Sequence, residues 1–350
     1  MEYEPRRMLV TGGLGFIFSN FIHHAVKHWP KCEFVILDIM DPSCGLEKNV
    51  QEPMQTGRVK LVKGDIRSAD LVNYLLHEHN IDTVLHAAAL THVDFSLNGN
   101  SLDFTSTNVV GTHTILECTR LYNNHHKQNQ SSGGVQKIIV VSTDEVIGGH
   151  DSLTPLSETA SLQCTNAYSA SKSAAELLCQ AYEKSHKLPL IITRSGNVIG
   201  TKQALSKMIP KFISRTIEGK PIQIHGDGLQ TRSFLVCDDV SNAFITIISK
   251  ASVGNVYNIG TEREYTVLSV ANMILQAFGN NGNNIQFVTE RLFQDRRYLI
   301  DSSKLRALGW YPQQTLEDVL PTIIDWYRQH YKTWWDNINI EESLKAHPRS

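Results

Sequence analysis

Two carboxylates stand side by side where an aliphatic stretch of the chain ends. Residues 137–142 are mostly aliphatic, and Thr143, Asp144 and Glu145 follow them directly. Neighbouring like charges repel each other and are costly to remove from water, so a solvated turn is the simplest explanation. A reaction that needs an acid and a base at one place would also use such a pair, because like-charge proximity pushes the two pKa values apart.

A tyrosine and a lysine form the second candidate pair. Tyr168 and Lys172 lie four residues apart in NAYSASKSAAE (166–176), a spacing that places both on one face of a helix. A lysine ammonium near a phenol lowers the pKa of the phenol, because it favours the phenolate. Such a tyrosine can exchange a proton with a hydroxyl group that loses or gains a hydride.

A glycine-rich turn supplies the third signal. In TGGLGFIFSN (11–20), Gly12 and Gly15 match the first two glycines of a dinucleotide-binding turn, which bring a pyrophosphate to the N-terminus of the next helix. Phe18 stands where a third glycine is usual, which predicts a displaced helix or a gap beside it. Asp38 ends the second expected strand, where its charge favours NAD over NADP. Asp65 ends the third, within reach of an adenine amino group.

The elements that must position these residues alternate along the chain. Continuous apolar strands separated by helical stretches are typical of a parallel sheet covered on both faces. The sequence predicts an α/β fold, a Rossmann-type doubly wound parallel sheet with a smaller C-terminal α/β lobe that begins near residue 200. The strands expected in the sheet are 8–11, 34–38, 59–64, 83–89, 137–142 and 190–195, with helices such as 68–79 and 171–184 between them. The lobe is expected to contain strands at 221–226 and 255–260 and a helix at 267–279.

The bulk composition argues against several classes of function. The 350 residues include 33 basic and 35 acidic side chains, so nothing favours a nucleic-acid partner or an anionic membrane surface. Six scattered cysteines without a CxxC pair favour reduced thiols in a cytoplasmic protein, with no metal site. We expect no signal peptide and no membrane span, because no apolar run approaches the roughly 18 residues that a span needs.

Two polar stretches are expected at the surface. Residues 123–134 (NNHHKQNQSSGG) predict a mobile loop, for which metal binding by the histidine pair is a minor alternative. The C-terminal tail carries Trp334 and Trp335, which are expected to be exposed, and a short terminal helix.

Taken together, the motifs resemble those of extended short-chain dehydrogenase/reductases, and within them the nucleotide-sugar 4,6-dehydratases, over nearly the full chain. The resemblance is greatest to the animal-type members that act on dTDP-D-glucose. The Thr-Asp-Glu run is the discriminating motif, because related epimerases and decarboxylases lack it. The motifs are TGGLGFI (11–17), GDI (64–66), HAAALTHVD (86–94), TNVVGT (107–112), VSTDEV (141–146), YSASK (168–172), TRSGNVIG (193–200), GDGLQTRSFL (226–235), YNIG (257–260) and DRRYLIDSSKL (295–305).

This resemblance implies a role for each chemical residue. Tyr168 would take the proton of the sugar 4-hydroxyl while hydride passes to NAD, and Lys172 would also hold the nicotinamide ribose. Glu145 would remove the C5 proton as general base, and Asp144 would protonate the departing 6-hydroxyl as general acid. Thr143 would hydrogen-bond the 4-oxygen. Hydride return to C6 would complete an NAD-dependent 4,6-dehydration of dTDP-glucose or UDP-glucose to the 4-keto-6-deoxyglucose nucleotide.

The same resemblance implies two sets of binding residues and no metal ligand. Those expected to bind NAD are Gly12, Gly15, Phe16, Ile17, Asp38, Ile39, Met40, Asp41, Asp65, Ile66, Ala88, Ala89, Leu90, Thr91, His92, Thr107, Tyr168, Lys172 and Val198. Those expected to bind the nucleotide sugar are His92, Thr143, Asn197, Lys207, Met208, Gln223, Ile224, His225, Arg232 and Arg291, the two arginines on the diphosphate.

The family pattern further implies how the chain is organised. Residues 1–200 would form the NAD-binding Rossmann domain that carries the catalytic residues. Residues 201–350 would be predominantly the nucleotide-sugar-binding lobe, with crossovers between the two. The helix that carries the Tyr–Lys pair and the helix before it would form the seam of a homodimer.

Several positions depart from the family pattern, while the chemical residues are intact. The departures are Phe18, Leu90, Ile147, Ile199 and Thr266, together with residues 290–295, which lack a Pro-Gly-His run. Two alternatives therefore stay open. One is a UDP-sugar epimerase or decarboxylase, against which Asp144 argues, and the other is a non-catalytic NAD-binding scaffold.

Overall fold

The computed structural model describes residues 2–131, 133–151, 153–280, 284–290, 295–335 and 338–344. Its largest element is a seven-stranded sheet in which every neighbouring pair is parallel. In spatial order the strands are β10 (Asn255–Ile259), β6 (Leu190–Ser195), β5 (Lys137–Thr143), β4 (Thr83–His86), β1 (Arg7–Thr11), β2 (Glu33–Asp38) and β3 (Val59–Lys63). This arrangement confirms the predicted α/β fold, and six of its strands were expected in this sheet from the apolar runs. The seventh, β10, was expected in the smaller lobe, which was wrong, because β10 pairs in parallel with β6.

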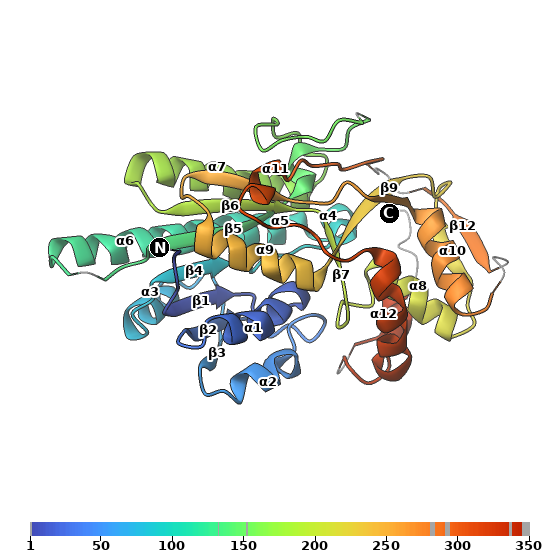
Figure 1. Ribbon diagram of the computed structural model, residues 1–350, viewed down its shortest axis with the longest axis horizontal. Coiled ribbons are helices and arrows are strands. Elements are labelled where there is room, and N and C mark those ends of the chain that lie inside the picture. Colours follow the sequence, from blue (N-terminus) through green and yellow to red (C-terminus); the bar gives the residue numbers. More distant parts are fainter. Residues whose placement is uncertain are drawn as a thin grey trace.

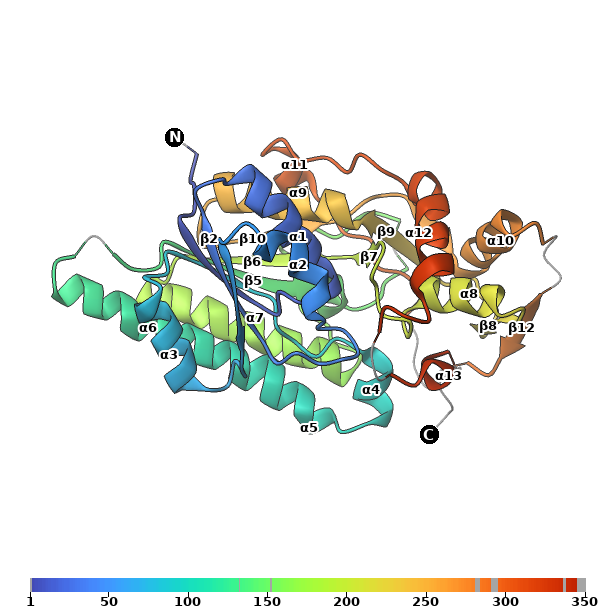
Figure 2. The same cartoon turned by 90° about the horizontal axis from the view of Figure 1, so that it is seen from below.

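Helices cover both faces of this sheet (Figure 2). On one face lie α1 (Phe16–His28) and α9 (Cys237–Lys250), which pack against each other. On the other lie α3 (Ala69–Glu78), α6 (Gly111–Gln128) and α7 (Ala167–His186). Two buried apolar clusters fill the two interfaces, as the continuous apolar strands require.

The smaller lobe lies beside the carboxyl ends of the sheet strands, at the right of Figure 1. It contains a sheet of β7 (Asn197–Ile199), β9 (Thr231–Val236) and β11 (Glu264–Thr266), and a pair of β8 (Ile222–His225) and β12 (Ile285–Val288). Its helices α8 (Met208–Ile217), α10 (Val267–Ala277) and α12 (Leu316–His330) share one buried apolar core with these strands. Because α9 and β10 return to the large sheet, the second half of the chain contributes to both parts.

Short elements complete the described chain. They are η1 (Glu47–Val50), α2 (Gln51–Met54), α4 (Val93–Asn98), α5 (Ser101–Phe104), the π-helical η2 (Thr105–Val110), η3 (Asp144–Ile147), α11 (Ser303–Arg306) and α13 (Ile340–Ser343).

Phe18 does not occupy a ligand site. Its ring is buried in the core between α1 and α9, with its centroid 4.9 Å from that of Phe244 and 6.2 Å from that of Phe21. The edge-to-face contacts between the three rings fill the space that a glycine would leave at this position.

Two expectations from polar composition were wrong. Residues 123–128 continue α6 rather than forming a loop, because Tyr122 is buried and the Asn123 side chain bonds both the N–H and the C=O of Val135. Trp335 is buried, with its ring stacked on Tyr327, so the tail contributes to the core of the smaller lobe.

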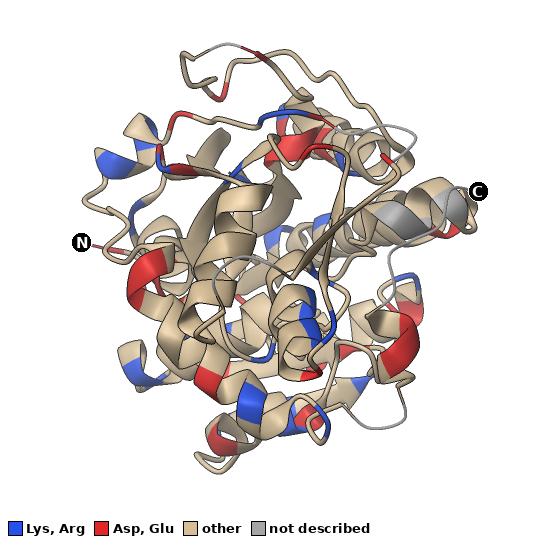
Figure 3. Cartoon of the chain, turned by 90° about the vertical axis from the view of Figure 1, so that its right-hand side faces the viewer, with Lys and Arg blue, Asp and Glu red and all other residues tan. Residues whose placement is uncertain are grey.

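Lys and Arg positions are interspersed with Asp and Glu positions along the ribbon when the molecule is viewed from the side of the smaller lobe (Figure 3). Among the described residues, no helix combines the length and the apolar character that a membrane span requires.

Candidate functional site

Asp144 lies at the carboxyl end of β5, in the first turn of η3. It is buried, and its Oδ1 accepts a hydrogen bond from the Thr143 hydroxyl at 3.2 Å. Burial, followed by the neighbouring charge of Glu145, raises the pKa of Asp144 to about 8. Asp144 therefore holds a proton near neutral pH and can donate it, as a general acid must.

Glu145 is less tightly enclosed and has polar partners. The Asn166 side-chain amide donates to its Oε2 at 3.4 Å, and its own N–H donates to the Thr143 hydroxyl. Burial raises the pKa of Glu145, whereas Asn166 and the charges of Lys207 and Arg232 act in the opposite direction. Arg232 acts in this direction on both carboxyl groups, and Glu145 additionally has the Asn166 amide and the charge of Lys207.

The Tyr–Lys pair lies in the first two turns of α7, beside these carboxylates. The helix begins with a capping box, in which the Asn166 side chain accepts from the Ser169 N–H. Tyr168 and Lys172 are both buried, and the Thr143 hydroxyl hydrogen-bonds the phenol. The strand end and the helix start thus bring all five predicted catalytic residues together.

One electrostatic expectation at this pair was wrong. The pKa of Tyr168 is raised, first by burial and then by the negative charge of Glu145, and Lys172 is not among the groups that shift it. Burial also lowers the pKa of Lys172 to about 8. The low dielectric around both groups disfavours their charged forms and outweighs the attraction that the spacing alone suggested.

Sequence reasoning missed Asn108, although it falls within the TNVVGT motif. Its side chain accepts from the Leu90 N–H at 2.8 Å and donates to the Leu90 carbonyl at 3.0 Å and to the Ser171 hydroxyl at 2.9 Å. This buried amide therefore joins the segment after β4 to the helix that carries Tyr168. Its place within a π-helical turn was the missing information.

The glycine turn between β1 and α1 has the geometry that a dinucleotide needs. Gly12 has a φ of +71°, and a Cβ atom there would lie 2.8 Å from the backbone of Ala88. Gly15 caps α1 without a side-chain hydrogen bond, which leaves the amides of the first turn facing outward. The Asp38 carboxylate accepts from the N–H groups of Leu14 and Met40, so it fixes this turn beside the end of β2. These residues fit the diphosphate and the adenosine ribose of a dinucleotide.

The other residues predicted to bind the cofactor differ in how exposed they are. Ile39 is exposed, whereas the side chain of Ile66 is buried against Gly111. The Asp65 carboxylate is bound by Arg67, which lowers the pKa of that carboxyl. The remaining positions follow β2 or β4 or lie on α1, η2 and β7; they are Phe16, Ile17, Met40, Asp41, Ala88, Ala89, Leu90, Thr91, His92, Thr107 and Val198.

A cavity of about 240 Å³ opens in front of Asp144 and Glu145, between the large sheet and the smaller lobe. Eight of the residues predicted to bind the nucleotide sugar line it, namely His92, Asn197, Lys207, Met208, Gln223, Ile224, His225 and Arg232. Thr143 lies behind the carboxylates, and Arg291 lies outside the described residues. Of the five predicted catalytic residues, Asp144 and Glu145 line the cavity, whereas Thr143, Tyr168 and Lys172 do not. The cavity therefore joins the two carboxylates to a basic and polar cleft.

Several lining residues were not singled out from the sequence. They are Val93, Leu97, Asn166, Ser206, Lys211, Phe212, Gln230, Phe234, Val267, Asp295 and Tyr298. Lys211 stands one helical turn after Lys207, a spacing that was visible in the sequence. Asp295 and Tyr298 fall within the DRRYLIDSSKL motif, but only the fold shows that they reach the site.

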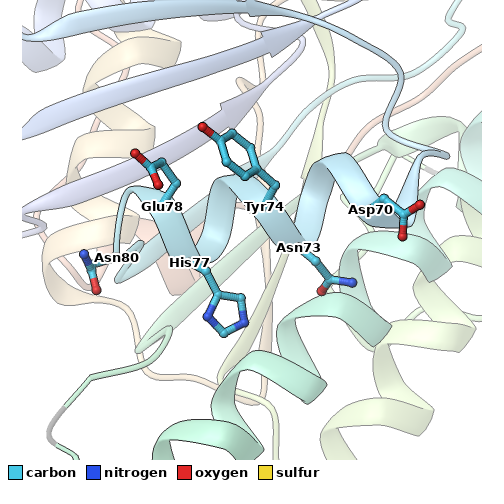
Figure 4. A pocket seen from close by; sticks show the side chains of 6 residues that line it. All are labelled: Asp70, Asn73, Tyr74, His77, Glu78 and Asn80. Atoms are coloured by element: carbon cyan, nitrogen blue, oxygen red, sulfur yellow. The ribbon is translucent and has the colours of Figure 1, made fainter.

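A second hollow lies along α3, and Figure 4 shows the side chains that line it. It is lined by Asp70, Asn73, Tyr74, His77, Glu78 and Asn80, none of which belongs to the predicted site. Within the described ranges, no group of three or more His, Cys, Asp or Glu side chains could hold a metal ion.

Comparisons with known proteins agree with this geometry. The family model of GDP-mannose 4,6 dehydratase matches residues 9–323. A trifunctional enzyme of Arabidopsis thaliana, whose first named activity is UDP-glucose 4,6-dehydratase, is 44% identical over 99% of this chain. This chain spans 50% of that plant protein. The human dTDP-D-glucose 4,6-dehydratase is 38% identical over 98% of this chain and 95% of its own length.

Solved structures show the same relationship. The dTDP-glucose 4,6-dehydratase DesIV from Streptomyces venezuelae, crystallised with NAD, superposes with a TM-score of 0.86 at 32% identity. The match covers 94% of this chain and 99% of DesIV. This chain therefore belongs to the nucleotide-sugar 4,6-dehydratase family of extended short-chain dehydrogenase/reductases, which are hydro-lyases.

Proposed function

We propose that this protein catalyses the NAD-dependent 4,6-dehydration of a pyrimidine-nucleotide glucose to the 4-keto-6-deoxyglucose nucleotide. The proposal rests on two adjacent carboxyl groups that both line the cavity. Asp144 is buried and has a pKa of about 8, and Glu145 beside it is more exposed. An epimerase needs no second carboxyl group of this kind, whereas an elimination needs an acid and a base on adjacent carbons.

The residues of the site suit a sequence of proton transfers. Tyr168 takes the proton of the 4-hydroxyl while Thr143 holds the 4-oxygen, since the two side chains are hydrogen-bonded to each other. NAD bound at the glycine turn would supply the hydride acceptor for C4 and the hydride donor for C6. Glu145 removes the C5 proton that the new ketone has acidified, and Asp144 gives its proton to the departing 6-hydroxyl, which leaves as water. C5 takes up a proton again when C6 is reduced. Lys172 would hold the nicotinamide ribose from the same face of α7.

Binding is divided between the two parts of the chain. Residues 1–200 hold the cofactor and carry the catalytic groups, with Asp38 favouring NAD because its charge repels a 2′-phosphate. Residues 201–350 mainly supply the nucleotide-sugar side, where the Arg232 guanidinium lies 5.0 Å from the Tyr298 ring and faces the cavity. A guanidinium suits a diphosphate, and Arg291 would supply a second one.

The base of the nucleotide is either uracil or thymine. The Arabidopsis relative is named for UDP-glucose, whereas the human and Streptomyces relatives are named for dTDP-glucose. One methyl group in a pocket is worth roughly 1 kcal/mol, which would separate the two substrates by about fivefold.

A homodimer completes the proposal. Leu121 on α6 and Leu177 on α7 are exposed, and the two helices pack side by side on one face of the sheet. A second copy placed against this face would cover both leucines.

The test is turnover of UDP-glucose and dTDP-glucose in parallel, with NAD+ and with NADP+. The expected product shows the alkali-induced absorbance of a 4-keto-6-deoxy sugar with NAD+ alone. Formation of UDP-galactose from UDP-glucose would replace the proposal by an epimerase. Release of CO2 and formation of UDP-xylose in a parallel incubation with UDP-glucuronic acid would replace it by a decarboxylase. NAD binding without turnover would replace it by a scaffold.

A further inference from the structure

The segment 295–301 connects the two halves of the molecule at the site. Its backbone accepts hydrogen bonds from Thr231 at the start of β9 (2.9 Å, to Arg296) and from His150 after η3 (3.2 Å, to Arg297). The catalytic roles proposed above assign nothing to this segment, although it reaches the cavity through Asp295 and Tyr298.

The Asp295 carboxylate binds the two segments that flank Glu145. Its Oδ1 accepts from the Gly149 N–H at 3.0 Å, four residues after Glu145. Its Oδ2 accepts from the Thr165 hydroxyl at 2.8 Å and from the Tyr298 phenol. Thr165 directly precedes Asn166, whose amide donates to Glu145. The buried Asp295 carboxylate thus connects the segment that follows Glu145 with the segment that contains Asn166.

The contact with Gly149 leaves no room for a side chain. A Cβ atom at Gly149 would lie 2.4 Å from Oδ1 of Asp295, so the backbone and the carboxylate approach as closely as glycine allows. The main chain of Asp295 is fixed from the opposite side, because Arg232 donates to its carbonyl oxygen at 3.0 Å. Asp295 is therefore held by both parts of the chain while it holds the loop of Glu145.

We propose that Asp295 is a positioning residue that fixes Glu145 for removal of the C5 proton, an inference that rests on the proposed dehydratase function. Asp144 and Thr143 do not depend on it, because Thr143 is in register with Ser195 in the sheet. Tyr168 does not depend on it either, because the capping box at Asn166 starts α7 without Asp295. Loss of the carboxylate should then slow the elimination and spare the oxidation at C4.

The experiment compares Asp295→Ala, Asp295→Asn and Thr165→Val with the unchanged protein, with Asp301→Asn as matched control. Asp301 lies in the same segment, but its carboxylate accepts from the Ser303 N–H at the start of α11. Each variant is assayed for kcat and KM, and the absorbance at 340 nm is followed after rapid mixing with the nucleotide sugar.

For Asp295→Ala we expect kcat to fall about 100-fold, because a misplacement of about 1 Å can have that effect, with KM within about threefold. Reduced nicotinamide should accumulate transiently, since oxidation at C4 now outpaces the elimination. Asp295→Asn should recover part of the rate, because its amide oxygen still accepts from Gly149. Thr165→Val should show a smaller fall in kcat with the same accumulation, and Asp301→Asn should behave like the unchanged protein.

The outcomes separate the possible errors. If kcat stays within threefold of the unchanged protein in both Asp295→Ala and Thr165→Val, or falls without accumulation at 340 nm, Asp295 does not position the base. If Asp295→Ala does not fold, Thr165→Val decides alone by the same two readouts. If the unchanged protein forms no 4-keto-6-deoxy sugar, the proposed function fails first, and this inference with it.

Discussion

At the scale of single residues, the chemistry depends on two adjacent carboxyl groups with different partners. Asp144 is buried and its side chain is hydrogen-bonded within its own turn, whereas Glu145 receives an amide from α7. The charge of Arg232 acts on both carboxyl groups, and that of Lys207 acts on Glu145 as well. The difference between their surroundings, rather than their adjacency alone, divides the acid role from the base role.

Glu145→Gln tests the base. The amide has the same shape and keeps an acceptor for Asn166, but it cannot take a proton. We expect kcat to fall by about 10²–10⁴, the usual contribution of a general base, with NAD binding unchanged and no solvent deuterium at C5. Proton NMR of the product in D2O measures this, with Glu33→Gln at the exposed start of β2 as control. Retained exchange at C5 would remove Glu145 from the base role.

Asp144→Asn tests the burial of the acid through stability. The folded-state pKa of about 8 lies above the ordinary value of 3.8, so the unchanged protein loses stability as pH rises between these two values. The neutral amide avoids that loss. We therefore expect Asp144→Asn to melt at a higher temperature than the unchanged protein, by an increment that grows from pH 4 to pH 8 and then stays constant. A difference in melting temperature that does not change with pH would show that the pKa of Asp144 is not raised in the folded protein.

At the scale of elements, the sequence predicted the strands well because buried parallel strands are continuous apolar runs. β1, β2, β5 and β6 begin and end within one residue of the expected runs. The same rule failed for residues 123–128, where helical contacts of Tyr122 and Asn123 outweigh polar composition. The sequence also could not predict the raised pKa of Tyr168 or the position of Asp295 beside the site. Both depend on contacts between segments that are distant in the sequence.

The C-terminal tail offers an element-scale prediction about the glycine turn. The buried Asn49 in η1 donates to the Leu14 carbonyl at 2.8 Å and accepts from the Trp334 indole at 3.1 Å. Asn49→Ala leaves the carbonyl of Leu14 unsatisfied, so we expect a stability loss of about 1–3 kcal/mol and weaker NAD binding. Trp334→Phe removes only the indole donor and should spare NAD affinity.

Chemical denaturation and titration with NAD measure these two effects. Equal loss of NAD affinity in Asn49→Ala and Trp334→Phe would show that the tail, rather than the bond to Leu14, supports the turn.

At the scale of the whole molecule, the two parts of the chain enclose the site between them. The large sheet supplies the carboxylates and the Tyr–Lys pair, and the smaller lobe supplies Arg232 and the polar wall of the cavity. Segment 295–301 and the return of α9 and β10 join the parts, so neither half is expected to retain activity alone.

The assembly can be tested on the exposed face of α6 and α7. Leu177→Glu places a charge where we propose a second copy to pack, and we expect the mass in solution to fall from twice the chain mass to the chain mass. Light scattering measures this. Val253→Glu, at another exposed apolar position, should leave the mass unchanged. A monomeric unchanged protein would contradict the proposed homodimer.

The most direct test of the whole account is one incubation of the unchanged protein with NAD+ and UDP-glucose or dTDP-glucose in D2O, followed by proton NMR. We predict a 4-keto-6-deoxyglucose nucleotide with deuterium at C5, in which the hydrogen of C4 has moved to C6. A 4-epimer, a product that retains its C5 proton, or unchanged sugar nucleotide in the presence of bound NAD would contradict it.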